Sequence, residues 1–370
     1  MKKYIVIGAG ILGASCAYYL ARSGADVTII DRNEPGAATD AAAGIVSPWL
    51  SKRRNKAWYH LAVNGARLYP ELVDELQAMG QADTGYKKVG GLNIHTDPDV
   101  LDDMAERARL KQKEAPEIGE VKRLDAEQTK AFFPMLADGY EAVYLSGAAR
   151  VDGRALKTAL LNAAQAHGAK FVQAHADLDV EAGQVKGVKL GSDYMAADQV
   201  IAANGAWMRD TLVPLGVTFR GWPQKGQIMH VQLDDTEPSD WPVINPPGRH
   251  YVLGFRDRLV IGATRDDWKG FNTDVTVDGA HEILSQALNV IPALKDARIL
   301  ETRVGFRPVT VDAMPVIGTL PGYEGLLLAN GLGSSGITIG PFVGQQLARW
   351  ALDQQLDIDP DRYVVSTVLR

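Results

Sequence analysis

The first 31 residues follow a strand, glycine turn, helix, strand and acid pattern that few folds accommodate. Residues 4–7 are apolar, the run GAGILG occupies 8–13, and Asp31 ends a second apolar run at 27–30. In such a unit the first glycine permits the turn, the second lets the backbone approach a pyrophosphate, and the third lets the helix pack on the sheet. Asp31 is suited to accept hydrogen bonds from ribose hydroxyls. The segment therefore predicts a dinucleotide-binding βαβ unit.

Length and composition predict a globular protein with more than one domain. At 370 residues the chain is longer than one hydrophobic core usually supports, and its 46% hydrophobic and 23% charged residues are ordinary for a folded enzyme. A net charge of −6 argues against binding to nucleic acid. The seven histidines are scattered, so we expect no metal site.

The chain has a single cysteine, Cys16, and therefore forms no internal disulfide. We interpret it as a small core residue of the first helix and expect a cytoplasmic location. The start, Met1 to Lys3 before an apolar run, resembles a signal peptide, but the strand–turn–helix pattern explains the same residues better. No apolar run reaches the roughly 18 residues of a membrane helix, so we expect no membrane span, and peripheral attachment stays open.

The pattern along the chain predicts an α/β fold with one domain inserted into another. Buried-strand and helix patterns flank segments rich in alternating, antiparallel-type strands. We expect a Rossmann-like nucleotide-binding domain built from 1–48, 150–219 and 306–370. The inserted α+β substrate-binding domain, on an antiparallel sheet, takes 49–149 and 220–305. Residues 234–248 hold four prolines, which favours a plain connection over a lid.

Individual elements are also predicted. Helical spacing of leucines indicates helices within 49–79 and a further helix around 101–109, and Asp152 is suited to cap a helix that ends near Gly168. Residues 199–202 are typical of a buried parallel strand. Near the C-terminus an apolar strand at 326–329 leads into a glycine-rich run, and Pro341 suits the first turn of the helix that follows.

That glycine-rich run, NGLGSSGITIG at 330–340, contains three glycines that let backbone N–H groups lie against a flat or anionic group. A flavin benefits from such a loop, because reduction places negative charge around N1 and the C2 carbonyl, which a helix dipole stabilises. The alternative is a tight turn without chemical meaning, and the run by itself leaves the two equally open. A nucleophile elbow is excluded, since neither serine has the required flanking glycines.

The segment Arg303-Val-Gly-Phe-Arg307-Pro308 reads as a strand in which Arg303, Gly305 and Arg307 share a face. An arginine held on a strand beside a cofactor is a natural bidentate partner for a substrate carboxylate. An ion pair of Arg307 with Asp312 or another acid is equally compatible with this segment.

Together these motifs resemble the flavin-dependent D-amino acid oxidase superfamily, which includes glycine oxidase, sarcosine oxidase and D-amino acid dehydrogenases. The resemblance spans nearly the whole chain. It is carried by GAGILGASCAYYLA, ATDAAAGIVSP, VIAANGAW, GFRPVTVDAMPVIG and GLGSSGITIGP, in that order.

The resemblance implies FAD bound without a covalent link, since the only cysteine lies in the first helix. The residues that it assigns to the cofactor are Gly8, Gly10, Ile11, Leu12, Gly13, Asp31, Arg32, Ala38, Thr39, Ala43, Gly44, Ile45, Gly331, Leu332, Gly333, Ser334, Ser335, Gly336, Ile337 and Thr338.

The resemblance further implies that Arg307 binds the carboxylate of a small amino acid, such as glycine, sarcosine or a D-amino acid, and that Tyr251 donates a second hydrogen bond to it. Hydride transfer from the α-carbon to flavin N5 then gives an imine, which water hydrolyses to a keto acid. Leu332 stands where many relatives have histidine. The electron acceptor, oxygen or a quinone or dye-type molecule, is therefore left open.

Two other functions compete with this interpretation. A 2-hydroxy acid dehydrogenase of the same superfamily would need a base, and His250 is the nearby candidate, although its strand position points it away from Tyr251. A flavin-binding subunit of a larger amine dehydrogenase is the other. The cluster Lys52–Arg54 with Trp58, Tyr59 and His60 is interpreted as a solvated helix face rather than a substrate entrance.

Overall fold

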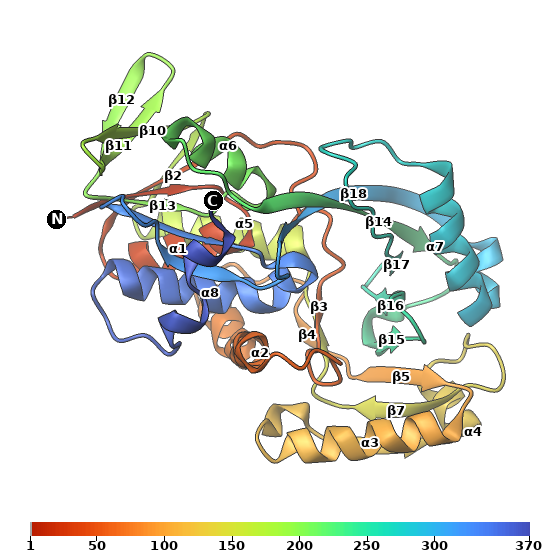
Figure 1. Ribbon diagram of the computed structural model, residues 1–370. Coiled ribbons are helices and arrows are strands. Elements are labelled where there is room, and N and C mark those ends of the chain that lie inside the picture. The colour runs from red at the N-terminus through yellow and green to blue at the C-terminus, as the bar shows by residue number, and fades with distance from the viewer. Residues whose placement is uncertain (1) are drawn as a thin grey trace.

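The computed structural model describes residues 2–370, and a six-stranded sheet organises its N- and C-terminal parts (Figure 1). The strand order is β19-β20-β13-β1-β2-β9, parallel throughout except for β19. The strands are β1 (Lys3–Ile7), β2 (Asp26–Asp31), β9 (Lys170–Gln173), β13 (Gln199–Ala202), β19 (Val316–Thr319) and β20 (Leu326–Asn330). The predicted parallel strand at 199–202 thus lies next to β1, and the Rossmann-like α/β class is confirmed.

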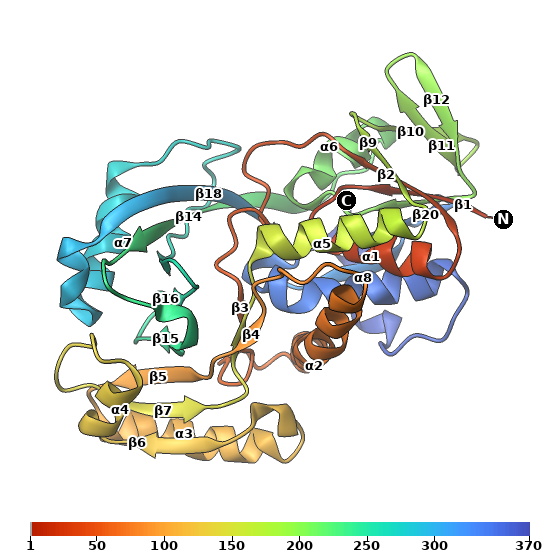
Figure 2. The ribbon, with the colours of Figure 1, turned by 180° about the vertical axis from the view of Figure 1, so that it is seen from behind.

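Alternate residues of these strands enter two different cores. Val6 and Ile29 face helices α1 (Ile11–Arg22), α5 (Gly153–Ala166) and α8 (Gly336–Ala351), whereas Ile5 and Ile30 face the other side. Figure 2 shows the three helices stacked along one face of the sheet. The opposite face carries a three-stranded sheet of β10 (Asp177–Glu181), β11 (Gln184–Leu190) and β12 (Asp193–Ala196), together with α6 (Met208–Leu212).

A second, eight-stranded sheet has the order β18-β14-β17-β16-β15-β5-β7-β6. Its strands are β5 (Gly91–His95), β6 (Val121–Leu124), β7 (Glu141–Leu145), β14 (Gly221–Gln232), β15 (Val243–Asn245), β16 (Tyr251–Gly254), β17 (Leu259–Gly262) and β18 (Arg298–Thr310). The long strands β14 and β18 pair along their length and join this sheet to the first unit (Figure 1). This is the predicted α+β substrate unit on a largely antiparallel sheet.

The remaining elements surround these two sheets. Helices α3 (Pro98–Gln112), α4 (Ala126–Phe132) and α7 (Val277–Val290) accompany the larger sheet, and β3 (Ile45–Val46), β8 (Ala149–Arg150) and β4 (Lys87–Lys88) form a small sheet between the units. Short 3₁₀ helices are Pro116–Ile118, Gly205–Trp207, Val213–Leu215, Pro238–Asp240, Pro292–Asp296, Gly333–Ser335, Pro360–Arg362 and Val365–Val368. Asp152 caps α5 as predicted, accepting hydrogen bonds from the N–H groups of Arg154 and Ala155 at 2.9 and 3.1 Å.

Helix α2 (Lys56–Ala78) packs beside α8 and buries Leu61, Leu72 and Leu76 in the core of the nucleotide-binding unit. It falls inside the predicted substrate segment 49–149, so the first helix of that segment lies with the other unit. The domain boundaries given above stay a prediction.

The proline-rich segment 234–248 is more than a connection, which corrects the interpretation made from its composition. Its centre forms β15, whose Val243 and Ile244 are fully buried and which pairs with β5 in parallel and with β16 in antiparallel fashion. The prolines flank this short strand rather than interrupt it, so the ladder hydrogen bonds survive. The segment therefore unites the two halves of the eight-stranded sheet.

Helix α8 begins at Gly336, so Pro341 lies inside the helix and not in its first turn as predicted. A proline lacks the N–H that would reach the carbonyl four residues earlier, here that of Ile337. The Tyr69 hydroxyl of α2 donates to that oxygen at 2.5 Å. The helix tolerates the proline because a neighbouring helix supplies the missing donor. Within residues 2–370, no helix combines the length and apolarity needed to cross a bilayer.

Candidate functional site

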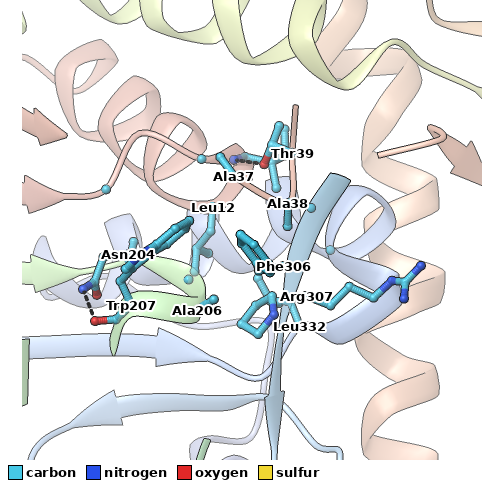
Figure 3. Close-up of a pocket in the computed structure, with 18 of the residues that line it drawn as sticks. Leu12, Ala37, Ala38, Thr39, Asn204, Ala206, Trp207, Phe306, Arg307 and Leu332 are labelled. Atoms are coloured by element: carbon cyan, nitrogen blue, oxygen red, sulfur yellow. Dashed lines mark hydrogen bonds between the residues drawn. The ribbon is translucent and has the colours of Figure 1, made fainter. Parts of the chain in front are cut away.

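A single cavity brings residues from both ends of the chain together where the two sheets meet. Figure 3 shows Leu12 of the first glycine motif and Leu332 of the second among its lining residues, with Trp207, Phe306 and Arg307 on the same cavity. The predicted residues that line it are Gly8, Gly10, Ile11, Leu12, Asp31, Arg32, Ala38, Thr39, Ala43, Gly44, Ile45, Tyr251, Arg307, Leu332, Gly333, Ser334, Gly336 and Ile337.

Four predicted cofactor residues lie outside the lining and have structural contacts instead. A Cβ at Gly13 would meet the Gly8 carbonyl oxygen at 1.8 Å, so this glycine lets α1 pack on the turn. Gly331 adopts a φ of 76° in the turn after β20. The Ser335 N–H donates to the Leu332 carbonyl at 3.1 Å, and the Thr338 hydroxyl donates to the Ile45 carbonyl at 3.1 Å.

At the nucleotide end of the cavity, both oxygens of Asp31 organise the first glycine turn. One accepts from the Ala9 N–H at 2.5 Å and the other from the Asn33 N–H at 2.6 Å. A carboxylate has about four lone-pair positions, so capacity remains for ribose hydroxyls. This geometry fits the role predicted for Asp31.

Two helices, α1 and α8, begin at the cavity, and neither is capped by the side chain of the residue that precedes it. Gly10, before α1, has no side chain, the Ser335 side chain accepts no hydrogen bond from α8, and neither first turn holds an acid. In α1 the Thr39 hydroxyl of the neighbouring loop accepts the first of these N–H groups, that of Ile11. First-turn N–H groups have no partner within a helix and carry partial positive charge. The two helix starts can therefore receive a pyrophosphate and a flat ring that becomes anionic, which is the donor set that FAD requires.

The loop 37–45 fixes the wall between these helix starts and the substrate sheet. The Thr39 hydroxyl oxygen accepts the Ile11 N–H at 2.9 Å, and Ala37 forms an isolated parallel bridge to Phe306 of β18. A Cβ at Gly305 would lie 2.6 Å from that of Ala41. Because Gly305 has no side chain, the loop 37–45 can lie directly against β18.

Arg307 forms no ion pair within residues 2–370, so the alternative of a pair with Asp312 or another acid is not realised in this structure. Its Nη1 donates to the Thr264 carbonyl at 3.1 Å. The guanidinium lies over β14 at Gly226, where a Cβ would stand 2.6–2.7 Å from three of its atoms. Burial is the main cause that lowers the pKa of Arg307, and the group stays cationic because arginine is not deprotonated in proteins. The cavity therefore contains a partly buried cation that forms no ion pair among the described residues.

Tyr251 lies close to this cation. Its hydroxyl lies over Gly262 of the neighbouring strand β17. A Cβ atom added to Gly262 would be 3.1 Å from the Tyr251 hydroxyl oxygen. Burial raises the pKa of Tyr251 to about 12, and Arg307 opposes that rise. The hydroxyl therefore keeps its proton across the neutral and mildly alkaline range and can donate to a carboxylate.

Sequence reasoning missed the two glycines beneath these side chains and the aromatic wall beside them. Gly226 and Ile228 line the cavity, and Trp207 stacks on Phe271 with ring centroids 4.9 Å apart and lies edge-on to Phe306. Trp207 is the last residue of the motif VIAANGAW, whose small residues also line the cavity. The run of small residues before this tryptophan is the sequence signal that could have identified it as a cavity residue. Strand pairing places Gly226 and Gly262 beneath these side chains, and the residues next to them in the sequence give no sign of it.

Several other residues considered from the sequence lie outside the cavity. Arg303 pairs with Glu301 at 2.7 Å, and His250 approaches Glu282 of α7 at 3.5 Å; neither lines the cavity. Arg53 lies over the Trp58 ring at 4.6 Å, and its cluster is also outside the lining. Cys16 is completely buried, and burial raises the pKa of its thiol. Among the described residues, no three potential metal ligands come together.

Comparisons with known proteins agree with this geometry. A family model described as FAD dependent oxidoreductase (DAO) matches residues 3–350. The chain is 53% identical over 365 residues to the uncharacterized oxidoreductase YurR of Bacillus subtilis (strain 168), covering 98% of both chains. It is 28% identical to the glycine oxidase of Pseudomonas putida (strain KT2440), again covering 98% of both.

A solved structure resembles the whole chain closely. The crystal structure of iminodiacetate oxidase (IdaA) from Chelativorans sp. BNC1 has 42% sequence identity and a TM-score of 0.95, covering 98% of each chain. With the family model, the glycine-motif geometry and the two helix starts at the cavity in agreement, this chain belongs to the FAD-dependent oxidoreductase (DAO) family, and its cofactor is FAD.

Proposed function

We propose that this enzyme oxidises the C–N bond of a small amino acid, giving an imine that water hydrolyses to a keto acid. The candidate substrates are glycine, sarcosine and D-amino acids, to which the relative IdaA adds iminodiacetate, a secondary amine with two carboxylates. The observation that carries the proposal is Arg307, a cation in the cavity that has no acidic partner and that a substrate carboxylate would neutralise.

Arg307 and Tyr251 have positioning roles in this reaction. The guanidinium fork binds the carboxylate, while the protonated Tyr251 hydroxyl donates a further hydrogen bond to it. Two points of attachment fix the orientation of the α-carbon within the cavity, which replaces a random encounter by a defined one. Bound FAD supplies the two-electron acceptor for the hydride that leaves the α-carbon.

The competing 2-hydroxy acid dehydrogenase has less support. It requires a base for the hydroxyl proton, and His250 lies outside the cavity lining beside Glu282. An amine needs no such base on the protein once it is neutral, because the nitrogen lone pair assists hydride departure directly. The amino acid is therefore the better match to the residues present.

The test compares Arg307→Ala, on β18, with Arg256→Ala, which removes an exposed arginine from the turn between β16 and β17 of the same sheet. In the wild type, anaerobic addition of the right amino acid bleaches the flavin. Removing charge-assisted hydrogen bonds should raise KM in Arg307→Ala roughly tenfold to a hundredfold, with flavin content unchanged. Arg256→Ala should behave as wild type. Unchanged kinetics in Arg307→Ala would remove its assigned role, and a wild type that no amino acid bleaches would overturn the proposal.

The same preparation identifies the acceptor. Oxygen consumption during turnover supports an oxidase, and reduction of a quinone or dye without oxygen consumption supports a dehydrogenase. Turnover by the isolated chain also separates an enzyme from a flavin-binding subunit. We further propose a cytoplasmic location, which the use of a single, buried cysteine supports.

A further inference from the structure

Two more arginines stand next to the carboxylate-binding pair, just beyond the residues that line the cavity. Arg265 directly follows Thr264, whose carbonyl accepts the hydrogen bond from Arg307. Arg249 lies two residues before β16, which begins at Tyr251. Both side chains belong to exposed residues, unlike the guanidinium of Arg307.

Strand pairing places the backbone of these two arginines at the same end of the β16–β17 pair. Tyr251 lies opposite Gly262 in the antiparallel β16–β17 pair. The chain before Tyr251 and the chain after Gly262 therefore leave the sheet at the same end of these two strands. The segment after β17 stays attached to β14, because Lys225 and Asp266 exchange two backbone hydrogen bonds of 2.9 Å. Arg265 is therefore carried on an anchored segment and not on a free loop.

Their charges reach the carboxylate site. After burial, the main cause, both Arg265 and Arg249 lower the pKa of Arg307 further, while Tyr251 and Asp266 act in the opposite direction. The three guanidinium groups consequently share one electrostatic environment. Like charges gathered in this way destabilise the free protein and become favourable when an anion of more than one charge binds.

Among the described residues, the nearby acids form no ion pair with these two arginines: hydrogen bonds from Gln224 and Trp222 lower the pKa of Asp267, and the charges of Arg265 and Arg307 lower it further without a direct contact. Within residues 2–370, neither Arg249 nor Arg265 forms an ion pair or side-chain hydrogen bond. The acids close by have other partners: Asp267 accepts from Trp222 and Gln224 at 3.1 and 2.8 Å, Asp266 faces the Thr264 hydroxyl at 3.4 Å, and Glu282 faces His250 at 3.5 Å.

We propose that Arg249 and Arg265 form a second anion subsite, which binds the distal carboxylate of an amino dicarboxylate while Arg307 and Tyr251 hold the carboxylate next to the reacting carbon. The inference rests on the proposed function and narrows its substrate class. Substrates of this class are secondary amines with an N-carboxymethyl group, of which iminodiacetate is the simplest, and amino acids with an acidic side chain. A zwitterion such as glycine or sarcosine leaves the second subsite empty.

Binding to the holoenzyme tests the subsite without turnover. Diglycolate and methoxyacetate carry an ether oxygen in place of the amine, so they are not substrates for C–N oxidation, and they differ by one carboxylate. Each is titrated while the change in flavin absorbance is followed. In wild type, diglycolate should bind at least roughly tenfold more tightly than methoxyacetate, since a charge-assisted contact is added. In the double variant Arg249→Gln, Arg265→Gln this ratio should fall by about the same factor.

Controls separate contact from general electrostatic attraction. Arg256→Gln removes one exposed arginine elsewhere on the hairpin and should leave the ratio unchanged. The double variant Arg249→Lys, Arg265→Lys keeps both positive charges but loses the planar guanidinium groups. The preference for diglycolate over methoxyacetate should therefore fall in this variant as well. A ratio that survives in the glutamine or the lysine double variant, or that falls equally in Arg256→Gln, would overturn the subsite.

Kinetics distinguish failure of this inference from failure of the proposed function. The ratio of kcat/KM for iminodiacetate to that for sarcosine should fall roughly tenfold or more in the glutamine double variant. If wild type oxidises sarcosine or glycine but does not favour iminodiacetate, the subsite is wrong and the amino acid oxidase stands. If no amino acid of either class reduces the flavin, the proposed function itself fails.

Discussion

At the scale of single residues, the site depends on small side chains as much as on charged ones. Arg307 and Tyr251 extend across the sheet because Gly226 and Gly262, on the neighbouring strands, leave room above the backbone. Both polar groups line the cavity and are partly buried there. Desolvation strengthens their interaction with a bound carboxylate.

Gly226→Ala tests this arrangement. The new methyl group would stand 2.6–2.7 Å from guanidinium atoms of Arg307, and the end of that side chain can move aside more easily than backbone can. The variant should fold with nearly wild-type thermal stability, while KM for the amino acid rises roughly tenfold or more as the fork loses its alignment.

Gly147→Ala is the contrasting control, measured by Tm and KM in parallel. A Cβ there would meet the backbone carbonyl oxygen of Glu117 at 1.8 Å, far from the cavity lining. It should lower Tm and leave KM unchanged. If Gly226→Ala instead lost stability and kept its KM, the guanidinium would not depend on the space above Gly226.

At the scale of elements, α2 and α8 form one structural unit although they lie in distant parts of the sequence. Gly65 of α2 lets the helices approach so closely that a Cβ would contact the Thr338 carbonyl oxygen at 2.2 Å. Next to this contact, the Tyr69 hydroxyl replaces the backbone donor missing at Pro341. Since α8 begins at the cavity, this pairing also positions the second glycine loop.

A double-mutant cycle on Tyr69 and Pro341 measures that replacement. Tyr69→Phe leaves the buried Ile337 carbonyl without a donor and should lower the free energy of unfolding by about 1–3 kcal/mol. Pro341→Ala restores a backbone N–H at the position four residues after Ile337. The loss caused by Tyr69→Phe should be clearly smaller in the Pro341→Ala background, as measured by urea denaturation with FAD in excess. Additive losses would show that the two groups do not share that oxygen.

At the scale of the whole molecule, charged side chains gather where the two units meet. His230 of β14 is buried, and Arg258 donates from Nε to its Nδ1 at 2.9 Å while also pairing with Asp152 at the start of α5 at 2.6 Å. Because arginine only donates, the neutral His230 carries its proton on Nε2. Burial, followed by repulsion from Arg303 and Arg258, lowers the pKa of His230 to about 4.

This depressed pKa predicts that the junction loses stability in mild acid. Above pH 6.5 His230 is neutral in both folded and unfolded chains, but between 6.5 and about 4 the unfolded chain binds a proton that the folded chain does not. The free energy of unfolding therefore falls as the pH falls, by at most roughly 1.4 kcal/mol per pH unit from this group.

His230→Gln should flatten that part of the stability profile, because a glutamine oxygen accepts from Arg258 without titrating. Chemical denaturation between pH 4 and pH 7 measures the slope, and His281→Gln, on an exposed helix position, is the control that should keep it. Equal slopes in wild type and His230→Gln would assign the acid sensitivity to other groups.

Sequence by itself determined what depends on local order along the chain. The glycine turn with Asp31, the buried strand at 199–202, the cap at Asp152 and the two glycine runs are local patterns, since a turn, a cap or a strand alternation is set by neighbouring residues. These patterns were enough to predict the α/β class and an inserted domain, and the resemblance that they carry to a family predicted FAD. They also identified Arg307 and Tyr251 as neighbours across the site, through resemblance to a family.

Tertiary structure decided what depends on contacts between distant segments. Only strand register places Gly226 beneath Arg307, brings Arg249 and Arg265 to the same end of the β16–β17 pair, and leaves Arg307 without an acid. Only the approach of α2 explains a proline inside α8, and only pairing with β5 turns a proline-rich segment into a strand. Such features arise from residues that are far apart in the chain and close in space. They therefore cannot be predicted from the order of neighbouring residues.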